Sequence, residues 1–106
     1  MSRRVDIVGK SGETYGFIRM DGDTSLRPVG VTYVIAAPAG RGWRVLHSGQ
    51  TENLAAGSWQ PVLLAHREEH PKAECLIRLN VSRSVRDAEV ADIEGATVGH
   101  GAPAPG

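Results

Sequence analysis

Two neighbouring segments decide the fold that this sequence predicts: Gly30-Val31-Thr32-Tyr33-Val34-Ile35 and Trp43-Arg44-Val45-Leu46-His47-Ser48-Gly49-Gln50-Thr51-Glu52-Asn53-Leu54. Both begin with runs of β-branched, aromatic and aliphatic residues, which favour strands. The loop between them is too short to hold a crossover helix, so the strands are expected to pair antiparallel. Alternation along the second strand predicts Trp43, Val45 and His47 on one face, with Arg44 and Leu46 on the other.

The second segment runs directly into a helical region. Thr51 is expected to cap a short helix over residues 52–56, and Gly57 to end it. Ser58 is expected to cap a second helix. Helical spacing places four side chains on its buried face, and Pro71 supplies the stop. These four are Trp59, Val62, Leu63 and His66.

A further strand over residues 74–80 and a last helix complete the central part of the chain. Ser82 or Ser84 is expected to cap this helix, which runs to about Ile93. We expect its small and aliphatic side chains to face the sheet. These are Val85, Ala88, Val90 and Ala91.

The N-terminal residues predict one more hairpin, with strands at 5–8 and 15–20 joined by the turn residues Gly9-Lys10-Ser11-Gly12. Residues 95–106 are rich in Gly, Ala and Pro and are expected to form a flexible tail. The sequence therefore predicts a single domain over residues 1–94. Its fold class is α+β, with a small antiparallel sheet of three central strands plus the N-terminal hairpin, flanked by helices.

Composition narrows the classes of function. The 106 residues carry a formal net charge of +0, which removes the simplest argument for nucleic-acid binding but leaves room for a local cluster of arginines. The single cysteine excludes an intramolecular disulfide and fits a reducing compartment. No stretch is long and apolar enough for a signal peptide or a membrane span. A cytoplasmic protein with no membrane association is expected.

The order of these elements, together with the text Pro28-Val29-Gly30-Val31-Thr32-Tyr33 and Gly49-Gln50-Thr51-Glu52-Asn53-Leu54, resembles the GIY-YIG endonuclease superfamily. In that family a Gly-x-Tyr strand is followed by Tyr-x-Gly and a Thr-x-(Asn/Asp)-Leu helix start. An arginine follows one turn later, and a later helix carries a metal-binding glutamate. The resemblance covers roughly residues 28–93 and implies a GIY-YIG-like fold.

The resemblance also implies a set of site residues. Tyr33 and His47 take the two tyrosine positions, and Glu89 is the nearest carboxylate to the metal position; these three are the candidate catalytic residues. Glu89 would hold Mg²⁺ or Mn²⁺ only in an active enzyme, and no other cofactor is expected. We expect a binding surface formed by Arg44, Gln50, Thr51 and Arg86.

Several family positions carry residues that lack the required chemistry. Gly57 stands at the arginine position, and Val90 at the glutamate position. Phosphodiester hydrolysis needs a cation against the charge that builds on the phosphate and a metal at the leaving oxygen. The sequence therefore predicts a non-catalytic binding or assembly module, with a protein or nucleic acid as partner. The alternative is a divergent metal-dependent DNA endonuclease.

A second motif suggests a different chemistry. His66-Arg67-Glu68-Glu69-His70 matches His-x-x-Glu-His, the pattern of inverted zinc proteases. That chemistry needs a helix that continues past the second histidine and a third ligand. Pro71 follows His70 directly and no third ligand is evident, so the sequence disfavours catalytic zinc and favours adventitious metal binding at the surface over it.

Overall fold

The structure is a computed structural model, and it describes residues 4–20, 27–40, 42–94 and 98–100. In chain order these residues form β1 (Arg4–Val8), β2 (Thr14–Arg19), β3 (Val31–Ala39), β4 (Gly42–Thr51), the 3₁₀ turn η2 (Leu54–Ala56), α1 (Trp59–Arg67), β5 (Glu74–Leu79), α2 (Arg83–Ile93) and β6 (Val98–His100). Neither helix in this part of the chain is long and apolar enough to cross a membrane.

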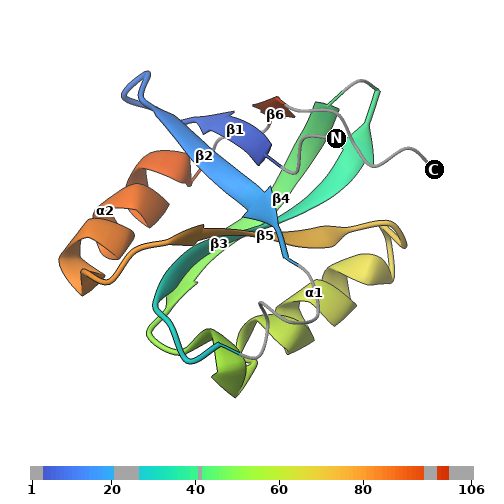
Figure 1. Ribbon diagram of the computed structural model, residues 1–106. Coiled ribbons are helices and arrows are strands. Elements are labelled where there is room, and N and C mark those ends of the chain that lie inside the picture. The colour runs from blue at the N-terminus through green and yellow to red at the C-terminus, as the bar shows by residue number, and fades with distance from the viewer. Residues whose placement is uncertain (1–3, 21–26, 41, 95–97, 101–106) are drawn as a thin grey trace.

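The strands form a closed antiparallel barrel in the order β1-β2-β5-β3-β4-β6 (Figure 1). β3 is the central strand of the three-stranded unit β5-β3-β4, because it pairs with β4 on one side and with β5 on the other. The N-terminal hairpin joins this three-stranded unit through the pairing of β2 with β5. The predicted α+β class, with an antiparallel sheet and flanking helices, is confirmed, whereas the closure into a barrel was not predicted.

β6 closes the barrel and corrects one prediction. Its residues pair with β1, where Asp6 lies opposite His100, and with β4, where Trp43 lies opposite Gly99. The prediction assigned residues 95–106 to a flexible tail because of their Gly, Ala and Pro content. β1 and β4 each present a free strand edge, and the backbone groups of these edges pair with β6. Local composition does not reveal such partners, because they come from distant parts of the chain. The rest of the predicted tail lies outside the described residues.

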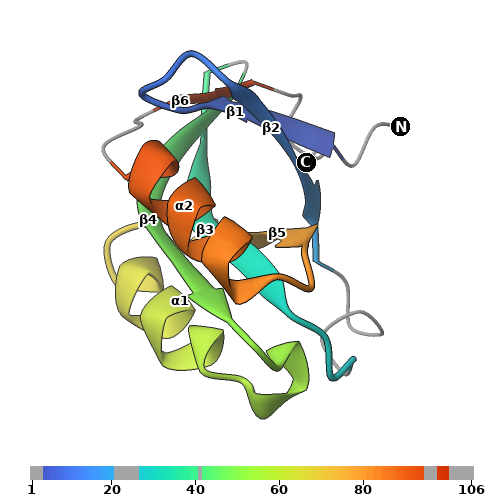
Figure 2. The same ribbon diagram turned by 90° about the vertical axis from the view of Figure 1, so that its left-hand side faces the viewer.

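The two faces of β3 belong to two different cores. Val31, Tyr33 and Ile35 point outward and pack with Trp59 and Leu63 of α1. The alternate residues point into the barrel, where a second apolar cluster fills the interior. That cluster contains Val5, Ile7, Phe17, Val34, Ala36, Trp43, Leu76 and Ile93. Figures 1 and 2 show that α1 runs along the outside of the barrel, while α2 occupies a separate position beside it.

A bulge in β4 overturns the predicted alternation of that strand. Ile35 lies opposite His47 and Ala36 opposite Val45, so Leu46 is the extra residue. An extra residue reverses the facing of every side chain beyond it. Trp43 and Val45 accordingly belong to the interior cluster, whereas His47 lies on the outer face beside Tyr33. The expectation that Trp43, Val45 and His47 share one face was wrong for His47.

The strand-to-helix corner after β4 forms as a 3₁₀ turn that is shorter than the predicted helix. Asn53 caps it, because its side chain accepts a hydrogen bond from the Ala55 amide at 3.1 Å. Thr51, the predicted cap, instead accepts from the Asn53 amide at 3.2 Å. Gly57 ends the turn with φ 74°, in the left-handed region that favours glycine. The position of the corner was predicted correctly and its capping residue was not.

Two of the three buried residues of α2 are charged, contrary to the prediction. Arg86, Glu89 and Ile93 are its buried residues, while Val85 is 44% exposed. The prediction followed the apolar side chains, as helical periodicity normally recommends. Here the barrel wall opposite α2 carries polar side chains that can pair with Arg86 and Glu89, so the helix turns those residues inward.

Candidate functional site

The first polar group on the barrel's inner face centres on Glu89 of α2. Its carboxylate accepts a hydrogen bond from the Thr32 hydroxyl at 2.8 Å and another from Arg78 Nε at 2.9 Å. Glu89 is 5% exposed and Thr32 is fully buried. Arg78 reaches in from β5 and also donates to the carbonyl oxygen of Gly16 at 3.3 Å. The buried carboxylate is thus neutralised by a guanidinium and held by a hydroxyl.

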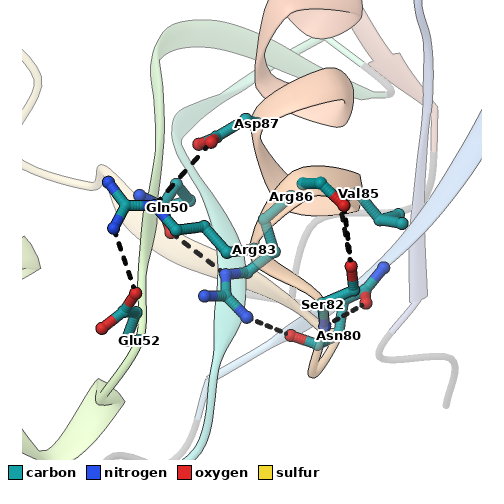
Figure 3. A network of polar contacts seen from close by, with 9 residues as sticks. Gln50, Glu52, Asn80, Ser82, Arg83, Val85, Arg86 and Asp87 are labelled. Carbon is teal, nitrogen blue, oxygen red and sulfur yellow. Dashed lines mark hydrogen bonds and ion pairs between the residues drawn. The ribbon is translucent and has the colours of Figure 1, made fainter.

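The second polar group lies one turn nearer the start of α2 and centres on Arg86 (Figure 3). Its Nε donates to Gln50 Oε1 at 3.0 Å, and its Nη1 donates to the Asn80 carbonyl at 2.7 Å. Arg86 is 2% exposed. The guanidinium crowds Gly30, since a Cβ atom there would collide with Arg86 Nη1. The Gln50 side chain of β4 and a backbone carbonyl of the β5–α2 loop therefore meet at one buried cation of α2.

Tyr33, His47 and His66 form a row of rings on the opposite, outer face of β3. The Tyr33 and His47 ring centroids lie 6.1 Å apart, and those of His47 and His66 lie 6.0 Å apart. Gly49 makes this row possible, because a Cβ atom there would lie 2.6 Å from the Tyr33 hydroxyl oxygen. Tyr33 is 7% exposed, so most of its ring serves the core between β3 and α1.

The surroundings of this row shift the pKa values of Tyr33 and His47. Burial raises the pKa of the Tyr33 hydroxyl, and nearby Cys75 adds to the effect. Partial burial lowers the pKa of His47, and the neighbouring charge of His66 lowers it further. Both groups are therefore held in their neutral forms at neutral pH. A neutral histidine can accept a proton, whereas a tyrosine with a raised pKa is a poor nucleophile.

The three candidate catalytic residues do not converge. Tyr33 and His47 lie together on the outer face of the sheet, and Glu89 lies with Thr32 on the inner face. Neighbouring positions along a strand point to opposite sides, so β3 itself separates the two groups. No substrate phosphate can touch both groups in this arrangement.

The residues around Glu89 do not fit the divalent metal that the family resemblance implies. Thr32 and Arg78 occupy one carboxylate oxygen each, and the Arg78 guanidinium places a positive charge where a cation would have to bind. Among the described residues, no three His, Cys, Asp or Glu side chains lie close enough together to hold a metal ion. In the zinc-protease motif, α1 ends at Arg67 before His70 is reached.

The four predicted binding residues lie at three separate locations. Gln50 and Arg86 lie in direct contact on the inner face. Thr51 belongs to the corner after β4, where its hydroxyl bonds the Asn53 backbone. Arg44 is exposed near the far end of β4, opposite Ala37, about 20 Å of strand away from Gln50. Only Gln50 and Arg86 therefore form part of one site.

Three residues of the inner-face site were missed from the sequence: Thr32, Arg78 and Asn80. Arg78 interrupts the otherwise apolar end of β5, Glu74–Leu79, and a lone arginine in such a strand is a usable signal for a buried pair. Thr32 gives no comparable signal, because threonine is common in strands. Asn80 contributes its backbone carbonyl to Arg86, which no sequence pattern announces.

Comparison of this chain with protein-family models, with curated proteins and with solved structures finds no match.

Proposed function

We propose that this chain is a GIY-YIG-like domain that binds a partner without cleaving nucleic acid. The observation that carries the proposal is the separation of Tyr33 and His47 from Glu89 by strand β3. The succession β3, β4, η2, α1, β5, α2 supports the likeness, since it follows the order of elements that the family resemblance implies. In this arrangement Tyr33 packs in the core against α1, and Glu89 forms an internal ion pair with Arg78.

The physical argument against cleavage concerns charge. Phosphodiester hydrolysis requires an activated nucleophile, a cation and a metal at one phosphate, each acting on charge that develops in the transition state. Gly57 leaves the arginine position without a cation, and loss of such a cation costs on the order of a thousandfold in rate. The positive charge of Arg78 is already taken by Glu89 at 2.9 Å. Each missing part lowers the rate further.

The surface charges favour a protein partner over nucleic acid. Several arginines are engaged with carboxylates within the chain: Arg19 with Glu74, Arg78 with Glu89, and Arg83 with Glu52. At the junction of β5 and α2, three aliphatic side chains are exposed instead: Leu79, Val81 and Val85. Nucleic acid is bound chiefly through unpaired cations near phosphates, whereas protein interfaces use apolar side chains at their centres.

The second candidate function is a divergent metal-dependent DNA endonuclease. The proximity of the Tyr33 and His47 rings favours it, because a neutral histidine beside the tyrosine is the base that a hydroxyl with a raised pKa would need. This candidate needs a metal site and a cation on the outer face, where Glu89 cannot contribute.

A nicking assay on supercoiled plasmid with Mg²⁺ or Mn²⁺ separates the two candidates. The wild type is expected to leave the plasmid as intact as a sample without protein. Tyr33→Phe and Glu89→Gln are expected to give the same result. Metal-dependent nicking by the wild type that disappears in Tyr33→Phe would establish the endonuclease and refute the proposal.

The class of partner is tested by DNA retention as a function of salt. Phosphate contacts always bring a steep dependence of affinity on salt concentration. We expect weak DNA retention with little dependence on salt, as befits a protein-binding surface. Tight retention that falls steeply with salt, and that weakens in Arg86→Gln, would show that nucleic acid is the partner.

A further inference from the structure

A shallow depression lies beside the start of α2, on the side of the molecule that carries the Arg86 group. It has a volume of about 360 Å³. Its lining consists of Pro28, Val29, Gly30, Glu52, Val81, Arg83 and Arg86. The walls therefore combine apolar side chains with two arginines and one carboxylate.

Arg86 is a buried cation without a carboxylate partner among the described residues. Its two hydrogen-bond acceptors are the neutral Gln50 amide and the Asn80 carbonyl. Arginine carries five N–H donors, and none of those on Nη2 is used by a residue that the structure describes. Nη2 is not among the fully enclosed unpaired atoms of that part of the chain, and Arg86 is one of the residues that line the depression. Burial of a charge with neutral partners is unfavourable unless a counter-ion completes the site.

The guanidinium is held in place before any ligand arrives. Gln50 and Asn80 fix two of its nitrogens, and the absence of a side chain at Gly30 lets it lie against the backbone. Figure 3 shows Arg86 clamped between Gln50 and Asn80. A planar guanidinium that is already oriented loses little freedom when it binds a carboxylate.

The charges around the depression favour an anion with a single charge. Arg83 is paired with Glu52 at 3.3 Å on the wall of the depression, and its second partner, Asp87 at 3.8 Å, is not one of the lining residues. The lining itself therefore carries two arginines against one carboxylate, and Arg86 supplies the excess positive charge. A phosphate group carrying nearly two negative charges would meet the Glu52 carboxylate on the same wall. A carboxylate, with one negative charge, matches the site better.

The apolar part of the lining indicates what the carboxylate is attached to. Pro28, Val29 and Val81 border the depression, and Val81 is 96% exposed. A side chain that is so exposed and so apolar gains from contact with another apolar group. We propose that the depression binds a carboxylate that carries a short aliphatic group, with Arg86 as its anchor. This inference rests on the proposed binding function, because it names the group that a partner presents.

The test is an NMR titration of the isotope-labelled full chain with isovalerate. Saturable shifts are expected at the amides of Gly30, Val81 and Arg86. Because Arg86→Met removes a buried contact and can disturb folding, two variants at the exposed Val81 carry the test. Both variants lose the apolar contact of Val81, so the comparison between them isolates the charge: Val81→Lys is expected to bind isovalerate about two- to fivefold more tightly than Val81→Asp. Leu64→Lys and Leu64→Asp, on exposed positions of α1, are the matched controls and are expected to change nothing.

Two further ligands distinguish the source of the carboxylate. N-acetylvaline represents the carboxylate end of a protein chain, and its amide has the same shape without the charge. Binding of isovalerate and N-acetylvaline, but not of the amide, supports the carboxylate site; tighter binding of N-acetylvaline assigns it to a chain end. Absence of saturable shifts with both acids would overturn the inference, as would tighter binding of inorganic phosphate at the same residues. Plasmid cleavage would refute the proposed function and leave this titration unchanged.

Discussion

The hydroxyl group of Thr32 donates a 2.8 Å hydrogen bond to Glu89, whereas the next side chain along the strand, Tyr33, packs against α1 on the other face of β3. One peptide unit thus separates two chemical environments. The inner environment holds buried charges that satisfy one another, and the outer one holds a row of rings. Any function of this domain has to use one face or the other.

The Thr32–Glu89 contact is expected to stabilise the fold measurably. Thr32→Val keeps the shape of the side chain and removes the hydroxyl donor, which leaves one oxygen of a buried carboxylate without its hydrogen bond. We expect the free energy of unfolding to fall by about 1–3 kcal/mol. Urea denaturation with an unchanged m-value is the measurement. Thr14→Val, at an exposed position of β2, is the control and should change stability by less than about 0.5 kcal/mol. Equal effects of the two substitutions would contradict the assignment.

His47 is expected to make stability depend on pH in the acidic range. Its pKa in the folded chain lies below the ordinary value of 6.5, because of partial burial and the charge of His66. The unfolded chain therefore binds the proton first, so stability is lost as pH falls from about 6.5 through the folded pKa. Melting temperatures measured between neutral and mildly acidic pH should show a smaller decrease in His47→Gln than in the wild type. The same decrease in both proteins would show that another group is responsible.

Asp92 is expected to stabilise the fold by linking the β1–β2 turn and β2 to the end of α2. It accepts hydrogen bonds from the Ser11 amide at 2.8 Å, the Ser11 hydroxyl at 2.6 Å and the Tyr15 hydroxyl at 2.8 Å. The Ser11 bonds and the Tyr15 bond lower the pKa of Asp92. Its contribution to stability is therefore present above the ordinary pKa of 3.8 and is lost as pH falls through the folded value.

The pKa of Tyr15 is raised to about 12, and the hydrogen bond from its hydroxyl to Asp92 is the main cause. The corresponding stabilisation is complete below the ordinary tyrosine pKa of 10.0 and is lost as pH rises through about 12. In Tyr33→Phe, where Tyr15 is the remaining tyrosine, a spectrophotometric titration of tyrosinate reports this group alone. Adding Asp92→Asn should move the midpoint back toward 10.0. An unmoved midpoint would mean that burial, and not Asp92, causes the shift.

The elements of the fold could largely be predicted from local patterns, because most strands and helices here follow ordinary periodicity. Tyr33 and Ile35 alternate with Val34 as the sequence suggests, and Trp59 and Leu63 face the core at helical spacing. Barrel closure could not be predicted in this way. It depends on β6 finding the free edges of β1 and β4, which is a relationship between distant segments.

The candidate site was predicted less well, for two physical reasons. The bulge at Leu46 places Trp43 and Val45 on the opposite face from His47, and no turn residue or composition signal marks it. The inward turn of α2 depends on partners from other strands, since Arg86 finds Gln50 and Glu89 finds Thr32. The helical periodicity of the apolar residues predicts a different buried face for α2. The tertiary pairing of Arg86 and Glu89 overrides that preference.

Whether Glu89 is a structural carboxylate or a metal ligand is decided most directly by a Mn²⁺ titration of the isotope-labelled chain, followed by NMR. A bound paramagnetic ion broadens the signals of nearby amides. Because Thr32 and Arg78 already occupy the carboxylate of Glu89, the account predicts no selective broadening around these three residues. Selective broadening at Thr32, Arg78 and Glu89 that disappears in Glu89→Gln would contradict it.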